Sequence, residues 1–113
     1  MNKSTIEKIT LPITNEQIKN LKAGDVVSLS GCVYTARDAA HKRFCEALDR
    51  GERLPVNING AAIYYCGPTP AVNGEIIGSC GPTTSARMDD YTPRLLKEGL
   101  KVMIGKGKRS DAV

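Results

Sequence analysis

The chain has 113 residues, 41% of them hydrophobic and 25% charged, with a formal net charge of +4 at pH 7, so we expect one compact domain over residues 1–113. No apolar run approaches the roughly 20 residues that a membrane helix needs, and residues 1–9 lack the apolar core of a secretory signal, which favours a cytoplasmic protein. The basic residues are spread along the chain and aromatic residues make up only 4%, so we expect a small anion rather than nucleic acid as the partner.

Strand and helix patterns alternate along the first half of the chain. Residues 6–11 read as a strand, and Thr14 followed by Gln17 predicts a capping box that opens a short helix ending near residue 21. Residues 25–30 alternate as a second strand. The most regular helical spacing covers 36–50 and closes on a glycine.

The second half continues the alternation. Strands are predicted at 62–66 and 75–79, separated by the Gly-Pro-Thr-Pro loop at 67–70, whose prolines prevent regular pairing. A helix is predicted from residue 83 to 88, another from 92 to 98 with a proline at its first position, and a last strand at 100–104. We therefore predict a mixed sheet with helices, an α/β or α+β domain.

The four cysteines are Cys32, Cys45, Cys66 and Cys80. They form no Cys-x-x-Cys pair and the chain has one His, which is poor spacing for zinc. Their number allows two disulfides, but a reducing cytosol favours free thiols. Buried structural thiols are the interpretation we favour, because Cys commonly packs as a small apolar side chain.

One segment with candidate chemistry lies at the start of the helix predicted at 36–50. Arg37 and His41 are four residues apart and share a helix face, and an arginine near a strand-to-helix turn suits a carboxylate. The alternative is an exposed first turn in which Asp38 complements the helix dipole.

A second segment, 78–89, contains three consecutive hydroxyl residues followed by an arginine. If a helix began near Thr83, free backbone N–H groups, the hydroxyls of residues 83–85 and the Arg87 guanidinium would converge on one oxyanion. The alternative is that these residues are ordinary helix caps after a Gly-Pro turn.

A third segment, Gly-Lys-Gly at 105–107, follows a predicted strand. It does not match a Walker phosphate loop, because neither the glycine spacing nor a Ser/Thr after the lysine is present. Lys106 either reaches into a cleft from the strand end or belongs to a basic tail that frays into solvent.

Four motifs in this order resemble a known family. They are Thr-Ala-Arg-Asp-Ala-Ala-His at 35–41, Ile-Tyr-Tyr-Cys-Gly-Pro-Thr-Pro at 63–70, Gly-Pro-Thr-Thr-Ser-Ala-Arg-Met-Asp at 81–89 and Gly-Lys-Gly at 105–107. Together they resemble the β subunit of class I fumarate hydratase, which is the C-terminal domain in single-chain members. The tartrate dehydratase β subunit is similar.

The resemblance implies a swivelling β/β/α domain that closes over a [4Fe–4S] cluster held by cysteines of an α subunit. This chain would then supply no metal ligand, which agrees with its scattered cysteines. In the family, an open iron acts as Lewis acid on the substrate hydroxyl while a base removes the proton from the neighbouring carbon. The implied enzyme is a hydro-lyase of the tricarboxylic acid cycle that interconverts malate and fumarate and is inactive without its α subunit.

Matching the motifs residue by residue implies roles for individual side chains. Arg37, Arg87 and Lys106 would hold the substrate carboxylates, with Thr84 beside them at the substrate. A C4 dianion needs at least two cationic anchors, and these three cations come from separate motifs.

The same matching assigns proton transfer to Thr83. A threonine hydroxyl is a weak base at neutral pH, so Thr83 would need cations that stabilise its alkoxide or would have to relay the proton onward. Asp38 and His41 are expected to position Arg37 rather than touch substrate.

Two alternatives to a fumarase remain: a tartrate dehydratase β subunit, and a non-catalytic anion-binding or assembly module. The pairs at 39–40 (Ala-Ala) and 64–65 (Tyr-Tyr) favour fumarate. Family members continue well beyond the Gly-Lys-Gly motif, whereas this chain stops at Val113. We therefore expect a fragment or short variant whose uncovered apolar surface associates with an α subunit or with another copy.

Overall fold

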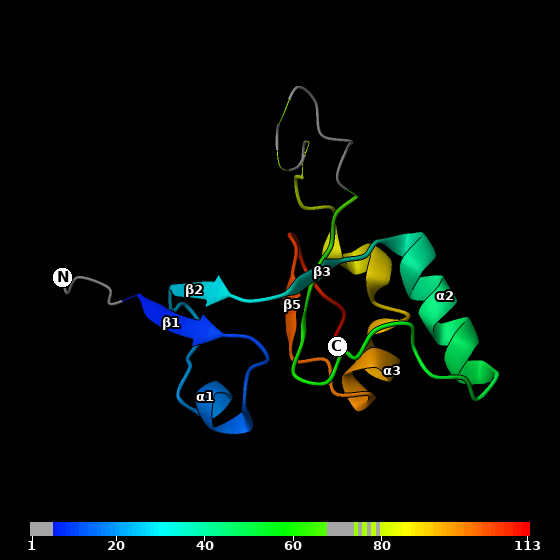
Figure 1. Ribbon diagram of the computed structural model, residues 1–113, viewed down its shortest axis with the longest axis horizontal. Coiled ribbons are helices and arrows are strands. Elements are labelled where there is room, and N and C mark those ends of the chain that lie inside the picture. Colours follow the sequence, from blue (N-terminus) through cyan, green and yellow to red (C-terminus); the bar gives the residue numbers. More distant parts are fainter. Residues whose placement is uncertain (1–5, 68–73, 75, 77, 79) are drawn as a thin grey trace.

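The computed structural model describes residues 6–67, 74, 76, 78 and 80–113. Helices and strands alternate in this part of the chain, which confirms a mixed α/β fold (Figure 1). The elements are β1 (Glu7–Thr10), α1 (Asn15–Lys19), β2 (Val27–Ser30), β3 (Val33–Thr35), α2 (Asp38–Asp49), β4 (Ala62–Tyr64), the 3₁₀ helix η1 (Ser85–Met88), α3 (Thr92–Lys97) and β5 (Val102–Ile104). No helix among these residues is long and apolar enough to cross a membrane.

The strands form two small sheets. One has the order β1-β2 and the other β3-β4-β5, with β4 in the centre. The expectation of a mixed sheet was wrong in one respect, because every strand pair in the described residues is parallel. A helical crossover lies between the two strands of each pair, and such a crossover returns the chain in the same direction.

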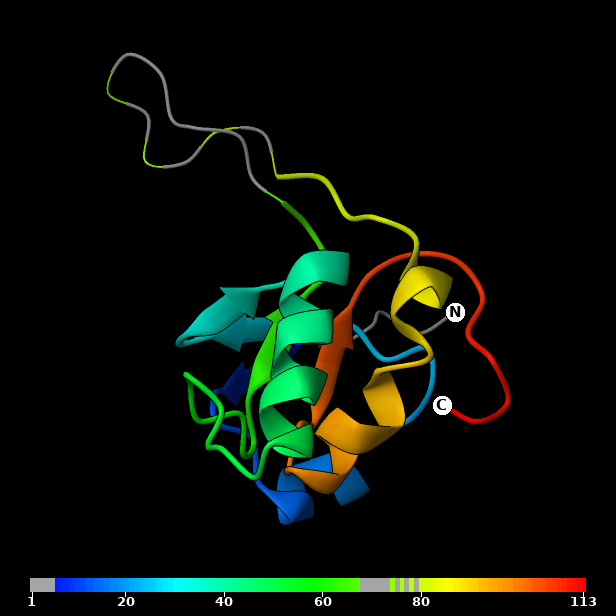
Figure 2. The same ribbon diagram turned by 90° about the vertical axis from the view of Figure 1, so that its right-hand side faces the viewer.

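Helices α2 and α3 cover one face of the β3-β4-β5 sheet (Figure 2). Side chains on a strand alternate between faces, so Ile63 and, just beyond β4, Tyr65 point toward these helices, and both are fully buried. Full burial of a side chain such as Ile63 contributes about 1.5–3 kcal/mol. This helix-side core contains Ala36, Phe44, Ile58, Ala61, Ile63, Tyr65, Met88, Leu95 and Leu100.

The opposite face of β4 is covered by the N-terminal segment. Ala62, the β4 residue between buried Ala61 and Ile63, packs in a second cluster with Ile9, Leu11 and Ile13. Partly buried Val102 of β5 joins this cluster from the neighbouring strand. The β3-β4-β5 sheet is therefore covered on both faces.

Arg109 attaches the C-terminal segment to the helix-side core. Its guanidinium donates hydrogen bonds to Asp89 Oδ1 at 2.7 Å, Thr92 Oγ1 at 3.0 Å and the Tyr65 hydroxyl at 3.1 Å. It also lies 5.1 Å from the centroid of the Tyr65 ring, a cation–π arrangement. The basic tail therefore folds back onto the domain at this residue.

Several predicted elements begin later than expected. The capping box is confirmed, since the Thr14 side chain accepts a hydrogen bond from the Gln17 N–H and the Gln17 side-chain oxygen accepts one from the Thr14 N–H. The helix predicted at 36–50 starts at Asp38, because the Ala36 N–H still pairs with Tyr64 O at 3.0 Å as an extension of the sheet. Strand β3 was not predicted. The strand predicted at 100–104 is shorter in the structure and corresponds to β5 alone.

Two predictions concern residues 67–79. The part of the Gly-Pro-Thr-Pro loop from Pro68 onward lies outside the described residues, and so does most of the strand predicted at 75–79. Ile76 and Gly78 are described, and neither belongs to a strand.

Candidate functional site

The predicted site residues lie near one edge of the β3-β4-β5 sheet. In a parallel sheet the carboxyl ends of all strands meet at the same edge, and ligands of open α/β sheets bind in the crevice outside it. Arg37 follows β3, Gly67 follows β4 and Lys106 follows β5. The fold therefore brings residues of three separate motifs to one edge of the sheet.

A cavity of about 690 Å³ opens at this edge. That volume suits a small molecule. Three arginines and one aspartate face it, so its electrostatic character favours an anion. The lining residues are Thr35, Ala36, Arg37, Asp38, Ala39, Ala40, Arg43, Phe44, Pro55, Cys66, Gly67 and Arg87.

Two of the three arginines were expected at the site and one was not. Arg37 is the last residue before α2, and Arg87 belongs to η1. Arg43 was not among the predicted site residues. The sequence does contain a clue to Arg43, because it follows Ala40 by three residues and both therefore lie on one face of α2.

Asp38 contacts Arg87 rather than Arg37. Its Oδ2 atom lies 3.5 Å from Arg87 Nε, and both side chains are about half exposed, so this ion pair contributes little stability. Its Oδ1 atom is buried without a hydrogen-bond partner in the described part of the chain. The pair joins the start of α2 to η1 across the cavity.

His41 lies beneath the cavity, in the core. Its side chain is fully buried, and its Nδ1 donates a hydrogen bond to the carbonyl oxygen of Arg37 at 2.8 Å. The ring stacks edge-on against Tyr65, with centroids 5.4 Å apart. Burial lowers the pKa of His41 below its ordinary 6.5, so the imidazole is neutral at pH 7. His41 therefore fixes the backbone of Arg37 and adds no charge to the cavity.

The expected cluster of free N–H groups near Thr83 does not form. The N–H of Thr83 donates to Tyr65 O at 2.7 Å, and that of Ser85 donates to Lys106 O at 2.8 Å. Thr84 and Lys106 form an isolated parallel bridge. This segment continues the sheet pairing instead of starting a helix, so the helix prediction at residue 83 was wrong and η1 begins two residues later.

Gly105 allows the segment at Thr84 and Ser85 to come this close to the chain before Lys106. A Cβ atom at Gly105 would overlap Ser85 Oγ and would lie 2.7 Å from Tyr65 Cδ2. The close contact leaves no room for a side chain before Lys106. Thr83, Thr84 and Lys106 thus lie at the same sheet edge as the cavity, but they are not among its lining residues.

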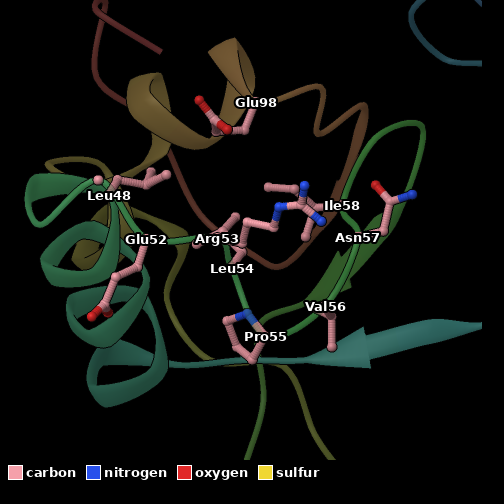
Figure 3. A pocket seen from close by; sticks show the side chains of 10 residues that line it. Leu48, Glu52, Arg53, Leu54, Pro55, Val56, Asn57, Ile58 and Glu98 are labelled. Atoms are coloured by element: carbon pink, nitrogen blue, oxygen red, sulfur yellow. The ribbon is translucent and has the colours of Figure 1, made fainter.

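A second cavity, of about 500 Å³, lies between the end of α2, the segment 51–58 and the end of α3 (Figure 3). Its charged lining residues are Glu52, Arg53 and Glu98. The two carboxylates disfavour a dianion, and no predicted site residue lines this cavity. The arginine-lined cavity is therefore the better candidate site.

All four cysteines are free thiols. Cys45 and Cys66 are buried, as expected for structural thiols, whereas Cys32 is exposed and Cys80 is partly exposed. Burial raises the pKa of the Cys66 thiol to about 11. Within the residues that the structure describes, no group of three or more His, Cys, Asp or Glu side chains could hold a metal ion.

Comparison with known proteins gives a consistent group of relatives. A family model described as "Fumarase C-terminus" matches residues 1–113. The chain is 43% identical over 98 residues to a putative L(+)-tartrate dehydratase subunit beta of Methanocaldococcus jannaschii, covering 84% of this chain and 50% of the relative. It is 38% identical over 102 residues to the L(+)-tartrate dehydratase subunit beta of Escherichia coli, covering 88% and 49%.

A longer relative carries a different name. The chain is 43% identical over 100 residues to a putative fumarate hydratase class I of Geobacillus stearothermophilus, covering 85% of this chain and 18% of the relative. The chain thus spans about half the length of the two beta subunits that it matches and less than a fifth of this longer protein.

Proposed function

Because the chain belongs to the Fumarase C-terminus family, we propose that it forms the substrate-binding part of a hydro-lyase that reversibly hydrates fumarate to malate. The observation that carries this proposal is the cavity at the carboxyl edge of the sheet, where Arg37, Arg43 and Arg87 meet. Its size and charge fit a small dicarboxylate.

The two arginines expected to bind substrate are positioned independently. Arg37 is fixed through its carbonyl oxygen by buried His41, and Arg87 is fixed by η1, which the Ser85 N–H anchors to Lys106 O. A guanidinium presents a planar fork that matches a carboxylate. Two such forks from separate elements can hold both ends of a dianion, and rigid holding of the reactant supplies part of a rate enhancement.

Hydration and dehydration of such a substrate build negative charge next to a carboxylate. When the proton leaves the carbon beside that carboxylate, the charge spreads onto the carboxylate oxygens, and a preorganised cation stabilises it. We propose that Arg87 or Arg37 has this role. Lys106, at the same edge, would add positive charge near the second carboxylate.

Thr83 is our proposal for the proton-transfer group. Its backbone is held by the hydrogen bond to Tyr65 O, and its side chain is partly exposed at the edge where substrate would bind. The hydroxyl is too weak a base to act without help. Neighbouring cations would have to stabilise its alkoxide, or it would pass the proton to a stronger base.

The proposed enzyme also needs a partner. We propose that the [4Fe–4S] cluster implied by the family resemblance is held by an α subunit, where it would supply a Lewis acid for the departing hydroxyl. The names of the two beta-subunit relatives support a second subunit. We propose that this chain is inactive alone.

A tartrate dehydratase is the second candidate. It is favoured by the two beta-subunit relatives, which carry that name and align over a larger share of their own length than the fumarate hydratase does. Tartrate has one more hydroxyl than malate, so the two substrates would place different groups against Ala39 and Ala40 of the cavity. These side chains offer no hydrogen bond to the extra hydroxyl, which favours fumarate.

The test is an anaerobic turnover assay. This chain, a cluster-loaded α subunit of a class I fumarate hydratase, and their mixture are each given malate, fumarate and L(+)-tartrate. Alkene absorbance is followed for malate and fumarate, and formation of oxaloacetate is followed for tartrate, because the enol left by its dehydration becomes a ketone. We expect malate–fumarate turnover in the mixture only. Turnover of tartrate alone would favour the second candidate, and no turnover in a mixture that forms a stable complex would leave a non-catalytic binding module.

A further inference from the structure

Two thiols meet at the rim of the arginine-lined cavity. The Sγ atoms of Cys66 and Cys80 lie 2.7 Å apart, closer than two unbonded sulfur atoms usually approach. Cys66 is 2% exposed and lines the cavity, while Cys80 is partly exposed. The pair therefore combines one accessible and one protected sulfur.

Hydrogen bonds to the backbones of Cys66 and Cys80 also hold the two thiols close together. The Tyr64 hydroxyl donates to the carbonyl oxygen of Cys80 at 2.7 Å, and the Cys66 N–H donates to Tyr64 O at 2.8 Å. Three residues after Cys80, the Thr83 N–H pairs with Tyr65 O. The end of β4 thus fixes both cysteine backbones, so the two thiols are already positioned when both are reduced.

The other two cysteines have different surroundings. Cys32 is exposed, and the Cys45 thiol is 4.0 Å from the carbonyl oxygen of Tyr91. Neither has a sulfur–sulfur contact in the described part of the chain. A metal site at Cys66 and Cys80 is also unsupported there, since no third ligand joins them.

We propose that Cys66 and Cys80 form a reversible dithiol–disulfide couple that reacts with small disulfides such as glutathione disulfide. In the first step, the Cys80 thiolate attacks the small disulfide, forms a mixed disulfide and releases one thiolate. The Cys66 thiol then gives its proton to that thiolate and attacks the Cys80 sulfur, which breaks the bond to the second small thiol. The protein loses two hydrogen atoms, and one small disulfide is reduced to two thiols.

The accessibility of the two sulfurs sets the order of attack. Burial raises the pKa of Cys66, so this thiol is a poor first nucleophile and a small disulfide cannot easily reach it. Once Cys80 carries the mixed disulfide, the attack by Cys66 is intramolecular and no longer requires access from solvent. Cys80 is therefore the attacking residue and Cys66 the resolving one.

The couple adjoins the residues that would bind an anion. A Cβ atom at Gly67, the residue after Cys66, would lie 3.2 Å from Arg37 Cδ and 3.3 Å from its Nη1. Oxidation would tie the segment at Cys80 to the wall against which Arg37 rests. An effect on turnover would rest on the proposed function, so the test below uses thiol chemistry alone.

The experiment exposes the reduced chain to glutathione buffers with rising proportions of glutathione disulfide. Free thiols are trapped with N-ethylmaleimide, and the products are mapped by mass spectrometry without reduction. In the wild type we expect two of the four thiols to be lost together, as a peptide linked through Cys66 and Cys80, and to return on addition of dithiothreitol.

Single variants test the two roles. In Cys66→Ser, Cys80 should accumulate a glutathione adduct, because the resolving thiol is gone. In Cys80→Ser, Cys66 should remain a free thiol, because it is buried. Cys32→Ser is the matched control and should oxidise like the wild type.

Three results in the wild type would overturn the proposal, and none depends on the folding of a variant. They are a persistent glutathione adduct on Cys80, a crosslink that includes Cys32 or Cys45, and four free thiols in the most oxidising buffer. Any of these would show that the close contact is only packing.

Discussion

His41 Nδ1 lies 2.8 Å from the carbonyl oxygen of Arg37, the residue that precedes α2. The hydrogen bond spans one helical turn and joins a fully buried ring to an arginine whose side chain lines the cavity. The backbone of Arg37 is therefore held by a residue that anion ligands cannot reach.

Replacing His41 should destabilise the domain. His41→Ala would remove a buried ring, its edge-on contact with Tyr65 and its hydrogen bond, and we expect a loss of about 3 kcal/mol in the free energy of unfolding. Urea denaturation measures this loss. The control is Lys42→Ala at the exposed neighbouring position, and an equal, small effect of both changes would contradict the burial of His41.

Stability should fall as the solution becomes mildly acidic. The pKa of His41 is lower in the folded chain than the ordinary 6.5 because burial disfavours the charged ring, so the unfolded state binds more protons in this range. The stability that neutral His41 contributes is fully present above pH 6.5. It is lost as the pH falls toward the pKa of His41 in the folded chain. Urea titrations between about pH 7 and pH 5 should show this decline in the wild type and a weaker one in His41→Phe. Parallel curves would exclude His41 as the cause.

On the proposed function, Arg87→Ala should strongly reduce turnover of the complex with the α subunit. Loss of a charge-assisted, bidentate contact to a carboxylate corresponds to a decrease in kcat/KM of roughly 10²- to 10³-fold. The spectrum of the cluster that we propose for the α subunit should not change. Arg94→Ala removes an arginine that pairs with Asp49 outside the cavity and is the matched control; loss of the spectrum in Arg87→Ala would indicate a structural role instead.

In the proposed enzyme, Arg43 should affect substrate affinity more than the chemical step. It lines the cavity from the exposed face of α2, and its guanidinium raises the local positive potential. We expect Arg43→Gln to raise KM several-fold and to leave kcat nearly unchanged. A fall in kcat as large as that of Arg87→Ala would place Arg43 at the reacting atoms.

Arg109 should control access of proteases to the C-terminal segment. In Arg109→Gln, the hydrogen bonds to Asp89 and the cation–π contact with Tyr65 are weakened, so residues 105–113 should open more often. Limited trypsin digestion should then cleave after Lys106 and Lys108 several-fold faster than in the wild type. Lys101→Gln, at an exposed position, should not change these rates.

Local chemistry was predictable from the sequence, and long-range pairing was not. The Thr14 capping box and the helical spacing of 38–49 depend on neighbours three or four residues apart, so the sequence identifies them directly. Strand β3 has only three residues, too few to show a period. The start of η1 is set by bonds from Thr83 and Ser85 to Tyr65 and Lys106, which no local pattern records.

The candidate site shows the same division. The motifs at 35–41 and 81–89 predicted Arg37 and Arg87, and the fold brings both to one cavity. The contact of Asp38 with Arg87 instead of Arg37 and the proximity of Cys66 to Cys80 depend on how separate segments meet. Spacing along the chain contains no information on either contact.

Strand β4 places Ala62 in one hydrophobic cluster and Ile63 in the other. A strand shared in this way couples the two halves of the molecule mechanically, because neither cluster can loosen without disturbing the backbone that supports the other. We therefore expect substitutions at Ile9 or Leu11, on the face of β4 opposite the helices, to be transmitted along this strand toward Gly67 and the cavity. Evolution can in this way adjust the ligand preference from positions that no ligand touches.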